Sequence, residues 1–166
     1  VKGQLNISPI FNRMAKASIK LRGQSDLQDI LKFLNHKDLN LISKYGIGTK
    51  GVGEVFFETD FTWPIRPTIK RDEFLWNVNA NGNELVLSSL PLNLRATESK
   101  IKIFASNQSF ELLSEGKLNN IETKFKFDKL KNTNPSVKIN IIESRELAKY
   151  ISNITGQKID GLALSL

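Results

Sequence analysis

The chain has 166 residues, among them no cysteine and a single histidine, His36. Without cysteine there is no disulfide and no thiolate nucleophile, and neither a zinc site of the Cys/His type nor a Cys-His pair can be built. Most carboxylates alternate with lysines along polar strand faces, whereas acid–base catalysis needs paired acids in a cleft. We therefore expect a protein that is not an enzyme, with no catalytic residue, no bound metal and no cofactor.

Long apolar runs are also missing, because no stretch of 18 apolar residues occurs. The sequence thus predicts no membrane-spanning helix. The chain opens on Val1 and closes on residues 159–166, which read as a strand cut in mid-run. We expect residues 1–166 to be a single fragment of a larger protein.

The formal net charge is +7, from 24 Lys and Arg against 17 Asp and Glu. A basic surface binds nucleic acid when its cations share a face with aromatic side chains on which bases can stack. Here the cations are spread over many strands among acids, and aromatics such as Phe57 and Phe125 fall on the opposite faces. We therefore expect no nucleic-acid partner.

Alternation of apolar and polar residues is the dominant pattern. Residues 54–63 place their apolar side chains on one face and their acids on the other, and residues 121–128 and 16–22 do the same. Successive side chains of a strand point to opposite faces, so each segment is a strand with one apolar and one charged face.

Ten strands are expected from this pattern, over residues 1–7, 15–23, 52–63, 72–80, 84–88, 99–105, 109–115, 118–128, 136–142 and 159–166. Asn81-Gly82 predicts a tight hairpin between the fourth and fifth of these strands. Gly116 and the pair Asn119-Asn120 are expected to interrupt the later strands.

Two amphipathic helices are also expected. Residues 26–35 follow Ser25, which with Gln28 forms a capping-box pattern. Residues 145–154 follow Ser144 and end before Gly156. The apolar stripes at helical spacing are Leu27, Ile30, Leu31 and Leu34 in the first helix and Leu147, Ile151 and Ile154 in the second. A short helical turn over residues 39–44 is a weaker expectation.

The strands and helices predict an all-β fold with two short amphipathic helices. Ten strands spaced about 4.8 Å apart make a sheet about 48 Å wide, while a helix is about 10 Å across, so two helices cover less than half of one face. We expect a long, twisted, mostly antiparallel sheet curled into a groove or half-barrel; a closed β-sandwich is the alternative. A helix followed by glycine and a strand occurs at residues 25–63 and again at 144–166, which indicates a weak repeat.

Residues 46–51 match the Gly-x-Gly-x-x-Gly pattern of dinucleotide-binding loops. That pattern binds pyrophosphate when it follows a strand and opens a helix. Here a helical segment precedes it and a strand follows, so we interpret it as a flexible loop.

The apolar strand faces define the candidate site, because we expect them to form one continuous surface. Its predicted lining is Val55, Phe57, Phe61, Trp63, Ile101, Ile103, Phe125, Phe127, Ile139 and Ile141. The two helix stripes are expected to pack on this surface and to plug or cap it.

Three segments carry a resemblance to a known family. They are Ser25-Asp-Leu-Gln-Asp-Ile-Leu-Lys-Phe-Leu-Asn-His, Ile42-Ser-Lys-Tyr-Gly-Ile and Gly51-Val-Gly-Glu-Val-Phe-Phe-Glu-Thr-Asp-Phe-Thr-Trp-Pro-Ile. Their succession resembles AsmA-like proteins of Gram-negative bacteria, the YhdP-type group in particular. Residues 88–94, 101–115 and 116–118 resemble the family's next unit, and the likeness covers most of residues 15–128.

The resemblance implies a periplasmic segment of an envelope protein, tethered to the inner membrane by a segment outside this chain. It further implies a role in carrying phospholipid along a hydrophobic groove between the two membranes. The expected partners are phospholipid acyl chains, flanking repeats of the same chain and other envelope proteins. The alternative function is a non-catalytic β-sandwich module for structure or protein interaction in the envelope.

Overall fold

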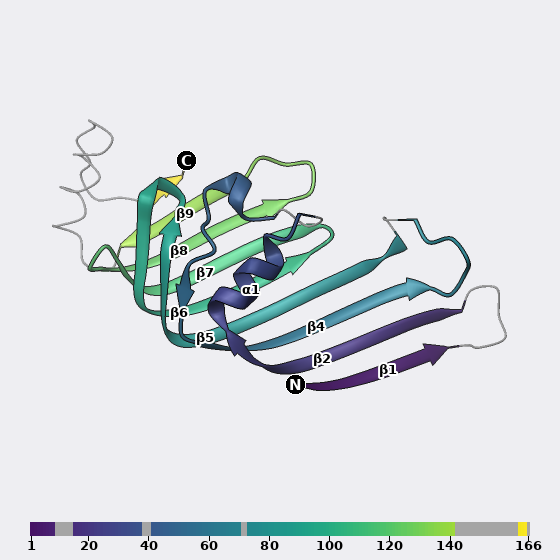
Figure 1. The fold of residues 1–166 in the computed structure, drawn as a ribbon. Helices are drawn as coiled ribbons and strands as arrows, with labels where there is room; N and C mark the ends of the chain where they lie inside the picture. Colours follow the sequence, from purple (N-terminus) through teal and green to yellow (C-terminus); the bar gives the residue numbers. More distant parts are fainter. Residues whose placement is uncertain (9–14, 38–40, 71–72, 142–162, 166) are drawn as a thin grey trace.

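The computed structural model describes residues 1–8, 15–37, 41–70, 73–141 and 163–165. Its strands form one sheet in the order β1-β2-β4-β5-β6-β7-β8-β9-β10, and β3 pairs in addition with β5. Every pairing is antiparallel. The sheet does not close on itself (Figure 1), so the described residues confirm the open all-β sheet and not the closed sandwich.

The strand bounds follow the alternating segments of the sequence closely. They are β1 (Lys2–Ser8), β2 (Lys16–Asp26), β3 (Gly51–Val52), β4 (Glu54–Pro64), β5 (Leu75–Leu90), β6 (Leu94–Ser106), β7 (Ser109–Leu118), β8 (Ile121–Leu130), β9 (Ser136–Ile141) and β10 (Ala163–Ser165). Burial alternates along them as well, most clearly in β6, where buried and exposed side chains take turns. The period of two in the sequence therefore sets which side chains face the core.

The predicted hairpin at Asn81-Gly82 is wrong, because β5 runs through this point without turning back. Asn81 pairs with Phe56 on one side and Lys102 on the other, as an ordinary strand residue does. The hairpin sits further on, where a 3₁₀ helix at Pro91–Asn93 joins β5 to β6. Both neighbouring strands offer ladder partners here, and these outweigh the local turn preference of the dipeptide.

Instead of a turn, this region contains a bend. The register of β5 against β6 shifts between Gly82 and Leu85, and β5 changes partner from β4 to β3 beyond the bend. Gly53 separates those two partner strands with a φ of 110°, and a Cβ added there would lie 2.5 Å from a methyl group of Leu85. A Cβ on Gly82 would lie 2.6 Å from the carbonyl oxygen of Glu54. The close approach of the segments around Gly53 and Gly82 therefore requires glycine at both positions.

The turn predicted at Asn119-Asn120 is confirmed, since these two residues link β7 and β8 with φ values of 47° and 72°. Two successive positive φ angles are typical of a type I′ hairpin turn, for which asparagine is well suited. Gly116, in contrast, does not end a strand. It lies within β7, opposite the register shift of β6 between Thr97 and Lys100.

The first helix is present as α1 (Leu27–Leu34), but the predicted capping box is wrong. Ser25 belongs to β2, where it pairs with Val55, and Asp26 is the N-cap, with no side-chain capping bond. The Leu27 amide instead donates to the carbonyl oxygen of Gly53 at 2.9 Å. The start of the helix is thus fixed by the segment around Gly53, which is distant in sequence. A 3₁₀ helix at Ser43–Tyr45 follows, which overlaps the end of the range expected for a short helical turn, residues 39–44.

The second predicted helix, residues 145–154, lies outside the described residues, and so does most of the repeat at 144–166. Figure 1 shows α1 in front of the sheet, with the joined ends of β5 and β6 turned up on the same side. We call the side of the sheet that faces α1 the apolar face and the other side the polar face.

Candidate functional site

The strand registers show which side chains share the apolar face. Residues directly opposite in a ladder lie on the same face, and one row runs from Phe57 through Ala80, Ile103 and Leu112 to Phe127. The remaining rows extend this set to all ten predicted lining residues, which are Val55, Phe57, Phe61, Trp63, Ile101, Ile103, Phe125, Phe127, Ile139 and Ile141. Their placement on one face is confirmed, whereas contact with lipid stays a prediction.

One end of this face, which we call the covered end, lies in strands β6 to β9 and beneath α1. The stripe of the helix, Leu27, Ile30, Leu31 and Leu34, is buried in the same cluster as the sheet residues. Tyr45 follows the helix along the chain and contacts Phe127, with ring centroids 5.5 Å apart. Phe125 is only 1% exposed. The covered end is therefore a filled core, in which the α1 stripe packs on the sheet as ordinary core residues do, and the role of the helix as a plug stays a prediction.

The other end, which we call the open end, comprises the apolar side chains of β1, β2 and the second half of β4. One row crosses it through Leu5, Ile19, Phe61 and Trp76. Leu5 is 59% exposed, the next two are half-buried, and Trp76 is buried. A second row begins at Ile7, which is 47% exposed. Along the first row, burial therefore declines from the core toward β1, and both rows end on exposed side chains in β1.

The predicted lining omitted several members of this surface. Leu5 and Ile7 alternate with polar residues in β1, and Ile19 and Leu21 do so in β2, which is the same signal that identified the predicted lining. Phe74 carries the same signal, because it is in phase with Trp76 and Val78 in the strand expected over residues 72–80, but in the structure it lies just before β5. It stacks on Phe61 with centroids 5.9 Å apart, and it lies 6.0 Å from the Trp63 ring.

The polar face carries cross-strand ion pairs at both ends of the sheet. Arg22 of β2 contacts Glu58 of β4 at 2.8 Å. Between β8 and β7, Lys126 contacts Glu111 at 2.6 Å and Lys124 contacts Glu115 at 2.7 Å. A hydrogen bond from Lys124 holds the pKa of the Glu115 carboxyl below its usual value. These pairs are solvent-exposed and contribute little to stability.

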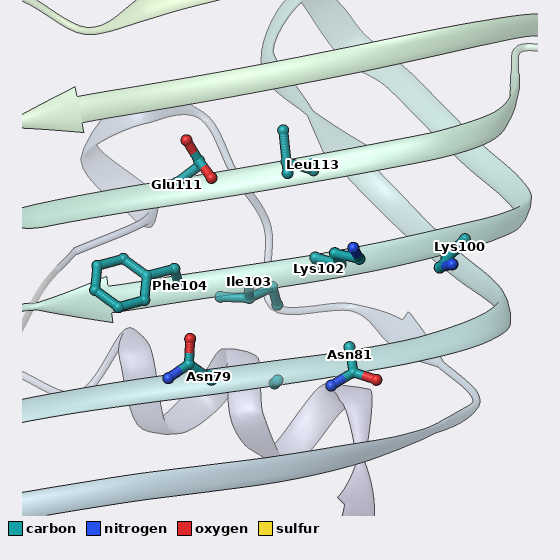
Figure 2. A pocket seen from close by; sticks show the side chains of 9 residues that line it. Asn79, Asn81, Lys100, Lys102, Ile103, Phe104, Glu111 and Leu113 are labelled. Atoms are coloured by element: carbon teal, nitrogen blue, oxygen red, sulfur yellow. The ribbon is translucent and has the colours of Figure 1, made fainter.

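An open hollow of about 590 Å³ lies on the polar face over β5, β6 and β7. Figure 2 shows Asn79 and Asn81 on β5, Lys102 and Phe104 on β6, and Glu111 on β7, with the helix behind the strands. The hollow and α1 are thus on opposite sides of the sheet. It cannot contribute to a binding surface for hydrocarbon on the apolar face.

Residues 46–50 form the loop expected from the reversed order of elements, between the 3₁₀ helix and β3, and Gly51 is the first residue of β3. Among the described residues, no group of three or more His, Cys, Asp or Glu side chains could hold a metal ion. No helix in the described part of the chain is both long and apolar enough to cross a membrane. Comparison of the chain with protein-family models, with curated proteins and with solved structures found no match.

Proposed function

We propose that this chain binds the hydrocarbon chains of phospholipids along the open end of its apolar face. The observation that carries the proposal is the continuity of one apolar surface from a filled core to exposed side chains in β1. Leu5 and Ile7 extend the rows that begin in the core, and half of their surface meets solvent. An acyl chain laid along this end would cover that surface.

The physical basis is burial of apolar area. Each methylene that leaves water contributes about 0.8 kcal/mol, so a chain of ordinary length binds without specific polar contacts. Ile19, Phe61 and Trp63 offer a half-buried floor of aliphatic and aromatic groups. Because such a floor holds a chain without fixing its position along the surface, a lipid can slide.

The resemblance to AsmA-like envelope proteins agrees with this proposal. The segments that carry it correspond to α1, to the chain up to Ile47, and to β3 and β4, which supply part of the covering layer and part of the floor. On this basis we propose a periplasmic segment of a protein that conducts phospholipid between the inner and outer membranes. The anchor and the flanking repeats belong to that proposal.

A second candidate is a structural or protein-interaction module of the envelope. The covered end favours it, because Phe125 and the α1 stripe are packed as in an ordinary core. In this case the open end would be covered by protein instead of lipid. Native mass spectrometry separates the two, because only a lipid-binding chain would carry phospholipid through purification from a bacterial envelope extract.

Two neighbouring substitutions in β2 test the proposal. Ile19→Asp places a charge on the open end, whereas Ser18→Asp places the same charge on the polar face, one residue away. We expect Ile19→Asp to remain folded and to bind a fluorescent fatty acid at least tenfold more weakly, because an acyl chain cannot solvate a carboxylate. Ser18→Asp should bind normally.

Fatty-acid titration monitored by fluorescence measures the binding, and circular dichroism measures the fold. A folded Ile19→Asp variant with unchanged affinity would contradict the proposal. A wild-type chain that binds no fatty acid and carries no phospholipid would favour the interaction module.

A further inference from the structure

The connection between β4 and β5 carries an unusual share of exposed apolar side chains. Twelve large apolar residues are exposed in the described part of the chain, and four of them lie between residues 65 and 75. These four are between 38% and 50% exposed, and they are Ile65, Ile69, Phe74 and Leu75. Four exposed apolar residues within eleven positions are an unusual density for a protein surface, which points to a binding partner.

Hydrogen bonds hold the connection in a defined shape. The Ile65 amide donates to the carbonyl oxygen of Ala15 at 2.7 Å, which fixes its start beside β2. The Glu73 carboxylate accepts hydrogen bonds from the Arg66 guanidinium and, at 2.9 Å, from the Lys70 amide. The Glu73 amide donates in turn to the Lys70 carbonyl oxygen at 3.0 Å. These bonds tie Ile65 to Ala15 and tie Arg66 and Lys70 to Glu73, while the Ile65 and Ile69 side chains remain 45% and 42% exposed.

Positive charge accompanies the apolar side chains. Lys16, Arg66 and Lys70 lie at this edge of the sheet, and Glu73 is the one acid among the described residues of the loop, so the local charge is three minus one, or +2. A hollow of about 250 Å³ adjoins them. It is lined by Lys16, Thr62, Trp63, Pro64, Glu73 and Leu75.

The same connection is continuous with the open end of the apolar face. Phe74 packs against Phe61 and Trp63, which belong to that face. The connection therefore meets the proposed acyl-binding floor through Phe74.

We propose that residues 65–70, which follow β4, dock together with Lys16 on a membrane surface that contains anionic phospholipid. Ile65 and Ile69 enter the boundary between headgroups and acyl chains, and Lys16 and Lys70 contact the phosphates. Apolar side chains interleaved with cations match such a surface, because shallow insertion and attraction to anionic lipid add together. The inference rests on the proposed function in one respect: the membrane would then present acyl chains to the open end.

The apolar contribution is tested with Ile65→Ser/Ile69→Ser in the 166-residue chain. The assay is co-sedimentation with vesicles of phosphatidylglycerol and phosphatidylcholine, with pure phosphatidylcholine vesicles for comparison. We expect the wild type to bind the anionic vesicles and the double variant to bind at least tenfold more weakly. Val52→Ser/Phe56→Ser is the matched control, because it removes two apolar side chains that are more exposed but lie elsewhere on the surface.

The charge contribution is tested with Lys16→Gln/Lys70→Gln. Each lysine near an anionic surface accounts for about a fivefold change in affinity, so this variant should lose tenfold or more on anionic vesicles and little on neutral ones. Lys100→Gln/Lys102→Gln removes the same charge from the polar face and should bind like the wild type. Thermal melting of every variant confirms that it is folded.

Three outcomes would overturn the docking inference: no binding of the wild type to anionic vesicles, equal losses in the test and control variants, or binding only to a protein partner. The fatty-acid assay contains no membrane and separates this inference from the proposed function. A chain that binds vesicles through residues 65–70 but binds no fatty acid retains the docking site and loses the acyl-binding proposal. The reverse result retains acyl binding and rejects docking.

Discussion

The covered end and the open end belong to one face of one sheet, yet they differ in burial. At the covered end Phe125 and Phe127 are buried, while at the open end Leu5 and Ile7 remain about half exposed. The alternation of apolar and polar residues is equally clean in both regions. The difference shows that a strand pattern selects which face is apolar but does not decide whether anything covers it.

The covered end is covered by elements that follow β2 in the sequence. Helix α1 follows β2 directly, and Tyr45, further along the chain, contacts Phe127. The bent half of β5 completes the cover, because Gly48 donates to the carbonyl oxygen of Ser89 at 2.9 Å and β3 pairs beside it. None of these described elements covers Leu5 or Ile7.

The sharpest test of the comparison places a carboxylate at each end. Phe125→Asp buries an unpaired charge in the filled core, which costs several kcal/mol and should leave the chain unfolded. Leu5→Asp places the same group where solvent already reaches it, so we expect a change within about 0.5 kcal/mol. Urea denaturation followed by circular dichroism measures both. A stable Phe125→Asp protein would mean that the covered end admits water.

A smaller effect is expected from truncations within α1, which test whether the helix is part of the core. Leu31 is fully buried, so Leu31→Ala should cost about 2–5 kcal/mol through lost burial and the cavity that remains. Phe33 on the outer side of the helix is 42% exposed, and Phe33→Ala should cost less than about 1 kcal/mol. Similar losses for the two variants, measured by urea denaturation, would show that the helix is not anchored by its stripe.

The smallest effect is expected on the polar face, where the two ends should behave alike. Glu58→Gln removes a pair at the open end and Glu115→Gln one at the covered end. Both should lower the melting temperature only slightly at pH 7 and less in high salt, because exposed pairs are screened. A large loss at only one end would contradict this symmetry.

The pH dependence of the Glu115 pair has a definite sign. Its carboxyl has a folded-state pKa below the usual 4.5, so the stabilisation is complete above pH 4.5 and is lost as the pH falls through the folded-state pKa. The difference in melting temperature between the wild type and Glu115→Gln should therefore shrink in acid. A difference that grows below pH 4.5 would rule out this pair as its cause.

Local patterns predicted much of the fold but failed where a neighbouring strand competed with them. The stripe of α1 and the faces of the strands follow from periods that each segment carries within itself. Asn81-Gly82 has the composition of a turn, yet Asn81 pairs with Phe56 inside a strand. Ser25 has the character of a helix cap, yet it pairs with Val55 inside a strand. In each case ladder hydrogen bonds with a distant segment replaced the local preference, and a single segment does not reveal its partners.

The candidate site divides in the same way. The sequence by itself determined that an apolar face exists and which of the predicted lining residues belong to it, because alternation is a property of neighbouring residues. Only the tertiary structure decided that Phe125 lies in a filled core while Ile19 and Phe61 lie toward an open end, and that Phe74 joins them from a loop. Coverage depends on where the chain returns across the sheet, and that path is set by long-range packing between segments far apart in sequence.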